Sequence, residues 1–115
     1  MKPFRQYARG ATKPGAMNKT EARYAEQLRL RQLAGEIEWF AYEAWTFKLA
    51  TDTRYTPDFV VMLAGGALEC HEVKGFWRDD AKVKIKIAAE KFPLQFLAVR
   101  EVAKKHGGGW EVTRF

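Results

Sequence analysis

Two apolar segments flank Gly65-Gly66 near the middle of the chain, and this arrangement predicts a β-hairpin. One arm covers residues 59–64 and the other covers residues 67–73. Side chains alternate between the two faces of a strand, so Glu72 and Lys74 share a face. A hairpin constrains the fold strongly because its register decides which side chains of two neighbouring segments can meet.

The place of Asp58 on this hairpin depends on the length of the loop. A two-residue turn at Gly65-Gly66 pairs Asp58 with Val73, which puts it on the face away from Glu72. A three-residue loop over residues 64–66, or a bulge, pairs Asp58 with Glu72 instead. The sequence is compatible with both registers.

The rest of the chain predicts an α/β fold with a mixed central β-sheet flanked by helices. Asn18 followed by Glu21 is a capping box, and it predicts a helix that ends near Gly35. Residues 83–87 alternate as a strand would, but two preceding aspartates and the following Pro93 favour a helix over residues 80–91. Further extended segments are expected at residues 37–42, 45–49, 94–99 and 110–115.

The formal net charge of +6 is concentrated in the first 20 residues, which contain Lys2, Arg5, Arg9, Lys13 and Lys19 and no acid. Residues 1–17 are interpreted as a flexible basic arm, and residues 18–115 as a single domain. Such an arm suits contact with phosphates. A solubilising tail and a contact with an anionic membrane are alternative interpretations.

Cysteine content and hydropathy bear on where the chain works. Cys70 is the one cysteine, which is typical of a protein in the reducing cytoplasm. No apolar run approaches the roughly 20 residues that span a bilayer, so no membrane-spanning segment is expected, and a membrane is not among the expected partners.

Asp58, Glu72 and Lys74 form a set with a clear chemical use. Two carboxylates can hold a hard divalent cation such as Mg²⁺, and a nearby ammonium can orient water or neutralise charge on a phosphate. Either pair alone is more often a set of solvated surface charges. Glu21 has two possible roles, as a helix cap or as a further metal ligand.

The ordered set of motifs resembles a known family. Pro57-Asp58 and Glu72-Val73-Lys74, preceded by Glu21 on a helix, are similar to the PD-(D/E)xK nuclease superfamily. The longer runs 54–59 and 71–75 more closely resemble small phage-type proteins related to Holliday-junction resolvases. The resemblance covers residues 18–115 and leaves the basic arm outside it.

This resemblance implies a fold, a site and a reaction. It implies a restriction-endonuclease-like core in which Asp58, Glu72, the backbone carbonyl of Val73 and Glu21 bind Mg²⁺ or Mn²⁺. Lys74 would position or activate the attacking water. The implied activity is hydrolysis of DNA phosphodiesters to leave a 5′-phosphate, on branched or junction DNA, by a homodimer acting inside a cell in which a phage replicates.

Basic residues outside these motifs are candidates for DNA contact. They lie in the arm, after the hairpin and in a Gly-rich loop: Lys2, Arg5, Arg9, Lys13, Lys19, Arg78, Lys82, Lys84, Lys86, Lys104 and Lys105. A non-catalytic nucleic-acid-binding protein derived from a nuclease fold, and a protein-interaction adaptor, remain alternative functions. Glu69 is expected to be solvated, and the aromatic side chains at 39, 40, 45 and 47 are expected in the core.

Overall fold

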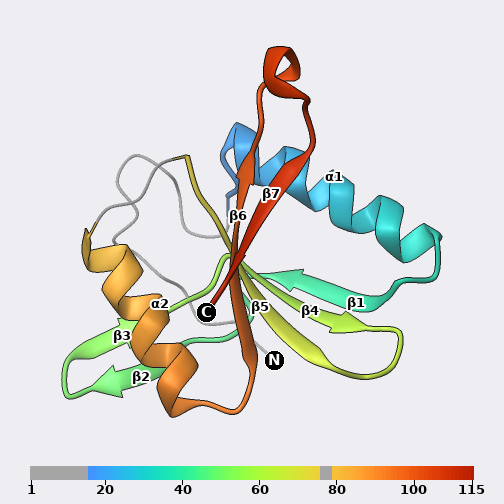
Figure 1. Cartoon of the computed structure of the whole chain (residues 1–115). Coiled ribbons are helices and arrows are strands. Elements are labelled where there is room, and N and C mark those ends of the chain that lie inside the picture. The colour runs from blue at the N-terminus through green and yellow to red at the C-terminus, as the bar shows by residue number, and fades with distance from the viewer. Residues whose placement is uncertain (1–15, 76–78) are drawn as a thin grey trace.

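The computed structural model of the chain describes residues 16–75 and 79–115 (Figure 1). Its elements in chain order are α1 (Lys19–Leu33), β1 (Ile37–Tyr42), β2 (Phe47–Ala50), β3 (Thr53–Tyr55), β4 (Phe59–Leu63), β5 (Leu68–Val73), α2 (Asp79–Lys91), β6 (Gln95–Glu101), the short 3-10 helix η1 (Lys104–His106) and β7 (Trp110–Arg114). The two helices and the strand order confirm the predicted α/β class.

Five strands form a mixed sheet in the order β1-β4-β5-β6-β7. The β5–β6 pair is parallel, and the other neighbours are antiparallel. The parallel pair requires a crossover, and α2 supplies it between the end of β5 and the start of β6. The predicted mixed sheet with flanking helices is therefore confirmed.

The two helices pack against opposite faces of this sheet. Tyr24 and Leu28 of α1 share a buried cluster with Phe59 of β4. Ile85 of α2 belongs to a second buried cluster, which contains Val60 of the same strand. Because consecutive residues of β4 point to opposite faces, the two clusters lie on the two sides of the sheet.

The predicted helix boundaries agree with the structure because local signals define them. The Asn18 side chain accepts a hydrogen bond from the Glu21 backbone, and the Glu21 carboxylate accepts one from the Asn18 backbone. Gly35 follows the helix at φ +83°, a left-handed conformation that glycine adopts without strain. At α2, the helical interpretation is confirmed over the alternating strand pattern.

A small two-stranded sheet, β2–β3, packs against α2 outside the main sheet (Figure 1). The predicted strand at 45–49 corresponds to β2, whereas β3 is too short to show a pattern of its own. The prediction that Trp39 and Trp45 belong to the core is wrong, since they are 40% and 37% exposed. Phe40 and Phe47 do pack against the buried clusters, as predicted.

The sheet topology brings the ends of several strands together at one end of the sheet. The register aligns Tyr42 of β1 with Phe59 of β4, and Phe59 with His71 of β5. The carboxyl end of β1, the start of β4 and the carboxyl end of β5 therefore lie together. The β6–β7 hairpin extends past this point and ends in η1 (Figure 1). No helix in the described parts of the chain is long and apolar enough to cross a membrane.

Candidate active site at one end of the sheet

The β4–β5 hairpin has a loop of three residues, 64–66. Phe59 pairs with His71, and the same register extends through the strands to the loop. The next position outward therefore places Asp58 opposite Glu72, and opposed residues of an antiparallel pair share a face. Of the two registers that the sequence allows, the structure has the one that brings the two carboxylates to the same face.

Asp58 is 2% exposed, and its Oδ2 accepts a hydrogen bond from the Val73 backbone N–H at 2.8 Å. This contact holds the Asp58 carboxylate against the end of β5, directly after Glu72. The carbonyl of Val73, which the family resemblance implies as a ligand, belongs to the same short segment.

The Glu72 carboxylate is bonded at both oxygens. Its Oε1 accepts a hydrogen bond from the Tyr55 hydroxyl at 2.8 Å, and its Oε2 lies 3.0 Å from Lys74 Nζ. Burial raises the pKa of Tyr55 far above its ordinary value, and the negative charges of Glu72 and Asp58 raise it further. The charges of both carboxylates therefore raise the pKa of the same phenol, as expected for two side chains on one face of the sheet.

Glu21 lies at the same end of the sheet but caps α1. Its Oε1 accepts hydrogen bonds from the Asn18 backbone and from the Tyr42 hydroxyl, each at 2.9 Å. Tyr42 is the last residue of β1 and packs on the α1 side of the sheet. The capping role of Glu21 is thus present in the structure.

The three acids do not form a ready-made metal cluster. Within residues 16–75 and 79–115, no group of three or more His, Cys, Asp or Glu side chains is arranged to hold a metal ion. The structure brings Asp58, Glu72 and Lys74 together and leaves Glu21 at the neighbouring helix cap.

The donor set at Asp58 and Glu72 nevertheless fits a hard divalent cation. Mg²⁺ and Mn²⁺ take oxygen ligands, and both side chains offer carboxylate oxygens. An ionised carboxylate has about four acceptor positions, so the contacts of Glu72 with Tyr55 and Lys74 do not use all the lone pairs of that group. In addition, Ala98 pairs with Glu72 across β5 and β6, so the side chain next to Glu72 on β6 is only a methyl group.

Two residues of this site are not identified by the sequence patterns. Tyr55 belongs to the run that resembles the family, but its hydroxyl contact depends on the fold of the small sheet. Glu43 follows β1, and its backbone N–H donates to the Asp58 carbonyl at 2.8 Å. Glu43 has φ +50°, a conformation that is costly for a residue with a side chain. The sequence patterns do not predict this backbone contact.

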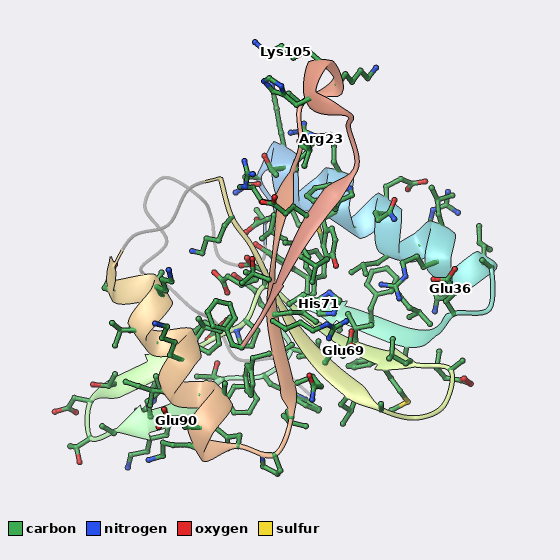
Figure 2. All side chains as sticks on the ribbon, viewed as in Figure 1. Arg23, Glu36, Glu69, His71, Glu90 and Lys105 are labelled. Atoms are coloured by element: carbon green, nitrogen blue, oxygen red, sulfur yellow. The ribbon has the colours of Figure 1, made fainter. Side chains whose placement is uncertain are left out.

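The candidate DNA-contacting residues fall into three groups. Lys19, Lys104 and Lys105 are exposed at the end of the sheet that carries the site, and Lys105 lies at the tip of the β6–β7 hairpin (Figure 2). Lys82 and Lys86 are exposed on α2, and Lys84 is partly buried there. Lys2, Arg5, Arg9, Lys13 and Arg78 lie outside the described residues.

The opposite face of β5 carries a separate polar chain. The Tyr24 hydroxyl lies 2.6 Å from His71 Nδ1, and His71 Nε2 lies 2.8 Å from Glu69 Oε1 (Figure 2). The prediction that Glu69 is solvated is wrong, since it is 7% exposed. The hydrogen bond with His71 lowers the pKa of Glu69. Because the ionised Glu69 carboxylate can only accept, His71 Nε2 carries a proton and donates to it. As predicted, His71 points away from Glu72.

Comparison with known proteins gives no match to a family model, to a curated protein or to a solved structure.

Proposed function

We propose that this chain is a metal-dependent DNA endonuclease with a restriction-endonuclease-like core. The observation that carries the proposal is the hairpin register, which places Asp58 opposite Glu72. Lys74 adds an ammonium at 3.0 Å from Glu72. The PD-(D/E)xK resemblance implies two carboxylates and one ammonium at the end of a strand. The spacing of these residues in the sequence does not by itself put them on one face, whereas this register does.

The proposed reaction is hydrolysis of a phosphodiester. Water adds to phosphorus, the bond to the 3′ oxygen breaks, and the products are a 5′-phosphate and a 3′-hydroxyl. A bound Mg²⁺ or Mn²⁺ supplies charge neutralisation and a more acidic water. Asp58 and Glu72 would hold that cation, and Glu72 also keeps the Lys74 ammonium close to them. That ammonium is placed to orient the attacking water or to offset negative charge on the phosphate.

Branched or junction DNA is the proposed substrate. The basic η1 loop extends beyond the site on the β6–β7 hairpin, and Lys19 starts α1 at the same end. Arg23 of α1 bonds Glu101 of β6 at 2.8 Å, so these basic residues lie close together and form one surface that can contact DNA phosphates. The choice of branched DNA rests on the family resemblance. Two symmetric cuts require two sites, so we propose a homodimer that acts in the cytoplasm.

A non-catalytic nucleic-acid-binding protein is the second candidate function. The observation that favours it is that Glu21, Asp58 and Glu72 do not form a three-acid group within residues 16–75 and 79–115. The same basic surfaces would then bind DNA without a cut.

Cleavage assays separate the two candidates. Labelled four-way junction, duplex and single-stranded DNA are each incubated with the protein in Mg²⁺, in Mn²⁺ or in EDTA. Asp58→Asn is the test variant, because the amide oxygen can still accept from the Val73 N–H. Glu90→Gln, on the exposed side of α2, is the matched control (Figure 2).

The nuclease proposal expects products with the wild type and with Glu90→Gln, and at least about a 100-fold slower cut with Asp58→Asn. If the wild type cuts no faster than Asp58→Asn, the nuclease proposal is wrong. Salt-dependent DNA binding that EDTA leaves unchanged, with no product, supports the binding protein instead.

A further inference from the structure

Both oxygens of the Glu72 carboxylate have a defined donor. Tyr55 donates to Oε1 at 2.8 Å, and Lys74 Nζ lies 3.0 Å from Oε2. The terminal torsion of a glutamate is broad and roughly two-fold, so the backbone and rotamer alone do not fix the plane of its carboxylate. Two donors on two different oxygens do fix that plane.

The two donors differ in rigidity. Lys74 has a long flexible side chain that is 22% exposed. Tyr55 is 7% exposed, and its ring lies 6.4 Å from the ring of Phe96 in the buried cluster under α2. A tyrosine has two side-chain torsions, and a packed ring fixes the position of its hydroxyl. Tyr55 is therefore the donor that sets the orientation of Glu72.

The small sheet holds Tyr55 in this position. Tyr55 pairs with Phe47 across β2 and β3, and Phe47 packs against the α2 cluster. Lys91 of α2 donates to the Leu49 carbonyl at 2.9 Å, which fixes β2 to the helix. The strands β2 and β3 do not pair with any strand of the main sheet. Tyr55 is the last residue of β3, and its side chain contacts Glu72.

We infer that Tyr55 is the positioning residue of the proposed active site, and that it holds the Glu72 carboxylate in the orientation from which Glu72 would bind a cation. This inference rests on the proposed function, because the orientation of Glu72 matters for activity only if Glu72 takes part in it. Partners of this kind that orient a metal ligand typically change metal affinity or activity by 10- to 100-fold when removed.

The first test is structural and does not depend on catalysis. Crystal structures of the wild type, Tyr55→Phe and Tyr24→Phe are compared. Tyr24→Phe is the matched control, because it also loses a buried hydroxyl but does so on the opposite face, beside His71. We expect the Glu72 carboxylate to rotate or to occupy two orientations in Tyr55→Phe, and to be unchanged in Tyr24→Phe. An unchanged Glu72 in Tyr55→Phe overturns the inference.

The second test measures binding and turnover in the same three proteins. Tyr55→Phe is expected to weaken Mn²⁺ binding in calorimetry by about 10- to 100-fold and to lower kcat by a similar factor, with KM for DNA unchanged. Tyr24→Phe should keep the wild-type affinity and kcat. Wild-type kinetics in Tyr55→Phe overturn the inference and leave the nuclease proposal intact. A wild type that cuts no DNA, with a rotated Glu72 in Tyr55→Phe, overturns the nuclease proposal and leaves the positioning role intact.

Discussion

Phe59 pairs with His71 across the β4–β5 hairpin, and this pairing decides which side chains share the candidate site. It turns His71 toward Tyr24 on the α1 side, and it places Asp58 and Glu72 together on the other side. A shift of one residue would exchange the faces of a whole strand. The geometry of the site is therefore a property of the hairpin loop as much as of the acidic residues.

Replacement of Lys74 tests its role beside Glu72. Lys74→Met removes the ammonium that lies 3.0 Å from the Glu72 carboxylate, so we expect cleavage to slow by about 100-fold or more. Lys74→Arg keeps the charge but changes its shape, and it should retain part of the activity. Single-turnover cleavage of junction DNA measures both. Lys48→Met, an exposed lysine of β2, is the control, and equal losses in it and in Lys74→Met would contradict a specific role.

Much of the fold follows from local signals in the sequence. The Asn18–Glu21 capping box and the glycine after α1 define the first helix, and alternating apolar residues define β4 and β5. These features depend on residues close together in the chain, so the pattern alone identifies them.

The parts that the sequence does not reveal depend on contacts between distant residues. Residues 64–66 fit two loops, and packing of both sheet faces selects one of them. Glu69 looks like a solvated strand residue, but His71 bonds it within the fold. Tyr55 reaches Glu72 only because β3 pairs with β2 beneath α2. In each case tertiary contacts override a local preference.

Alkaline unfolding tests the buried phenols and the thiol. Burial raises the pKa of Tyr24 and Tyr55, and it raises that of Cys70 to about 12. A raised pKa stabilises the fold fully below the unfolded value and loses this contribution as pH rises above it. The unfolded chain releases the Cys70 proton around the ordinary thiol value of 9.0 and the two phenol protons around the ordinary tyrosine value of 10.0, whereas the native protein keeps all three up to about pH 12.

The free energy of unfolding should therefore fall by about 1.4 kcal/mol per pH unit for each of these groups. Urea denaturation at a series of pH values measures the slope. Tyr24→Phe should reduce this slope by about 1.4 kcal/mol per pH unit, the contribution of one phenol. Thr113→Val, which removes an exposed hydroxyl, should leave the slope unchanged. A slope that Tyr24→Phe leaves unchanged would show that this phenol ionises normally in the native protein.

Acid denaturation tests the Glu69–His71 contact in the opposite direction. The hydrogen bond from His71 lowers the pKa of Glu69 below its ordinary 4.5. The resulting stabilisation is present above pH 4.5 and is lost as the pH falls through the lowered value. Glu69→Gln should be less stable than the wild type at pH 7, and the difference should shrink as the pH falls below 4.5. Chemical denaturation at pH 7 and at a series of values below 4.5 measures it, and a constant difference would contradict the assignment.

The basic hairpin loop should contribute salt-dependent DNA affinity without taking part in the cut. Lys104 and Lys105 are exposed in η1, beyond the site, and each can neutralise one phosphate. Their joint replacement by alanine should weaken junction binding and reduce the slope of log affinity against log salt by about 2. The rate of cleavage at saturating protein should stay near the wild-type rate, because neither lysine touches the reacting groups.

Fluorescence anisotropy at several salt concentrations gives the slope for this variant. A double variant with the same loss of charge, Arg29→Ala with Lys48→Ala, is the matched control, since both side chains are exposed on other surfaces. An equal change of slope in both double variants would mean that net charge alone governs binding. A smaller slope in the loop variant alone would place the DNA along the β6–β7 hairpin, at the same end of the sheet as Asp58 and Glu72.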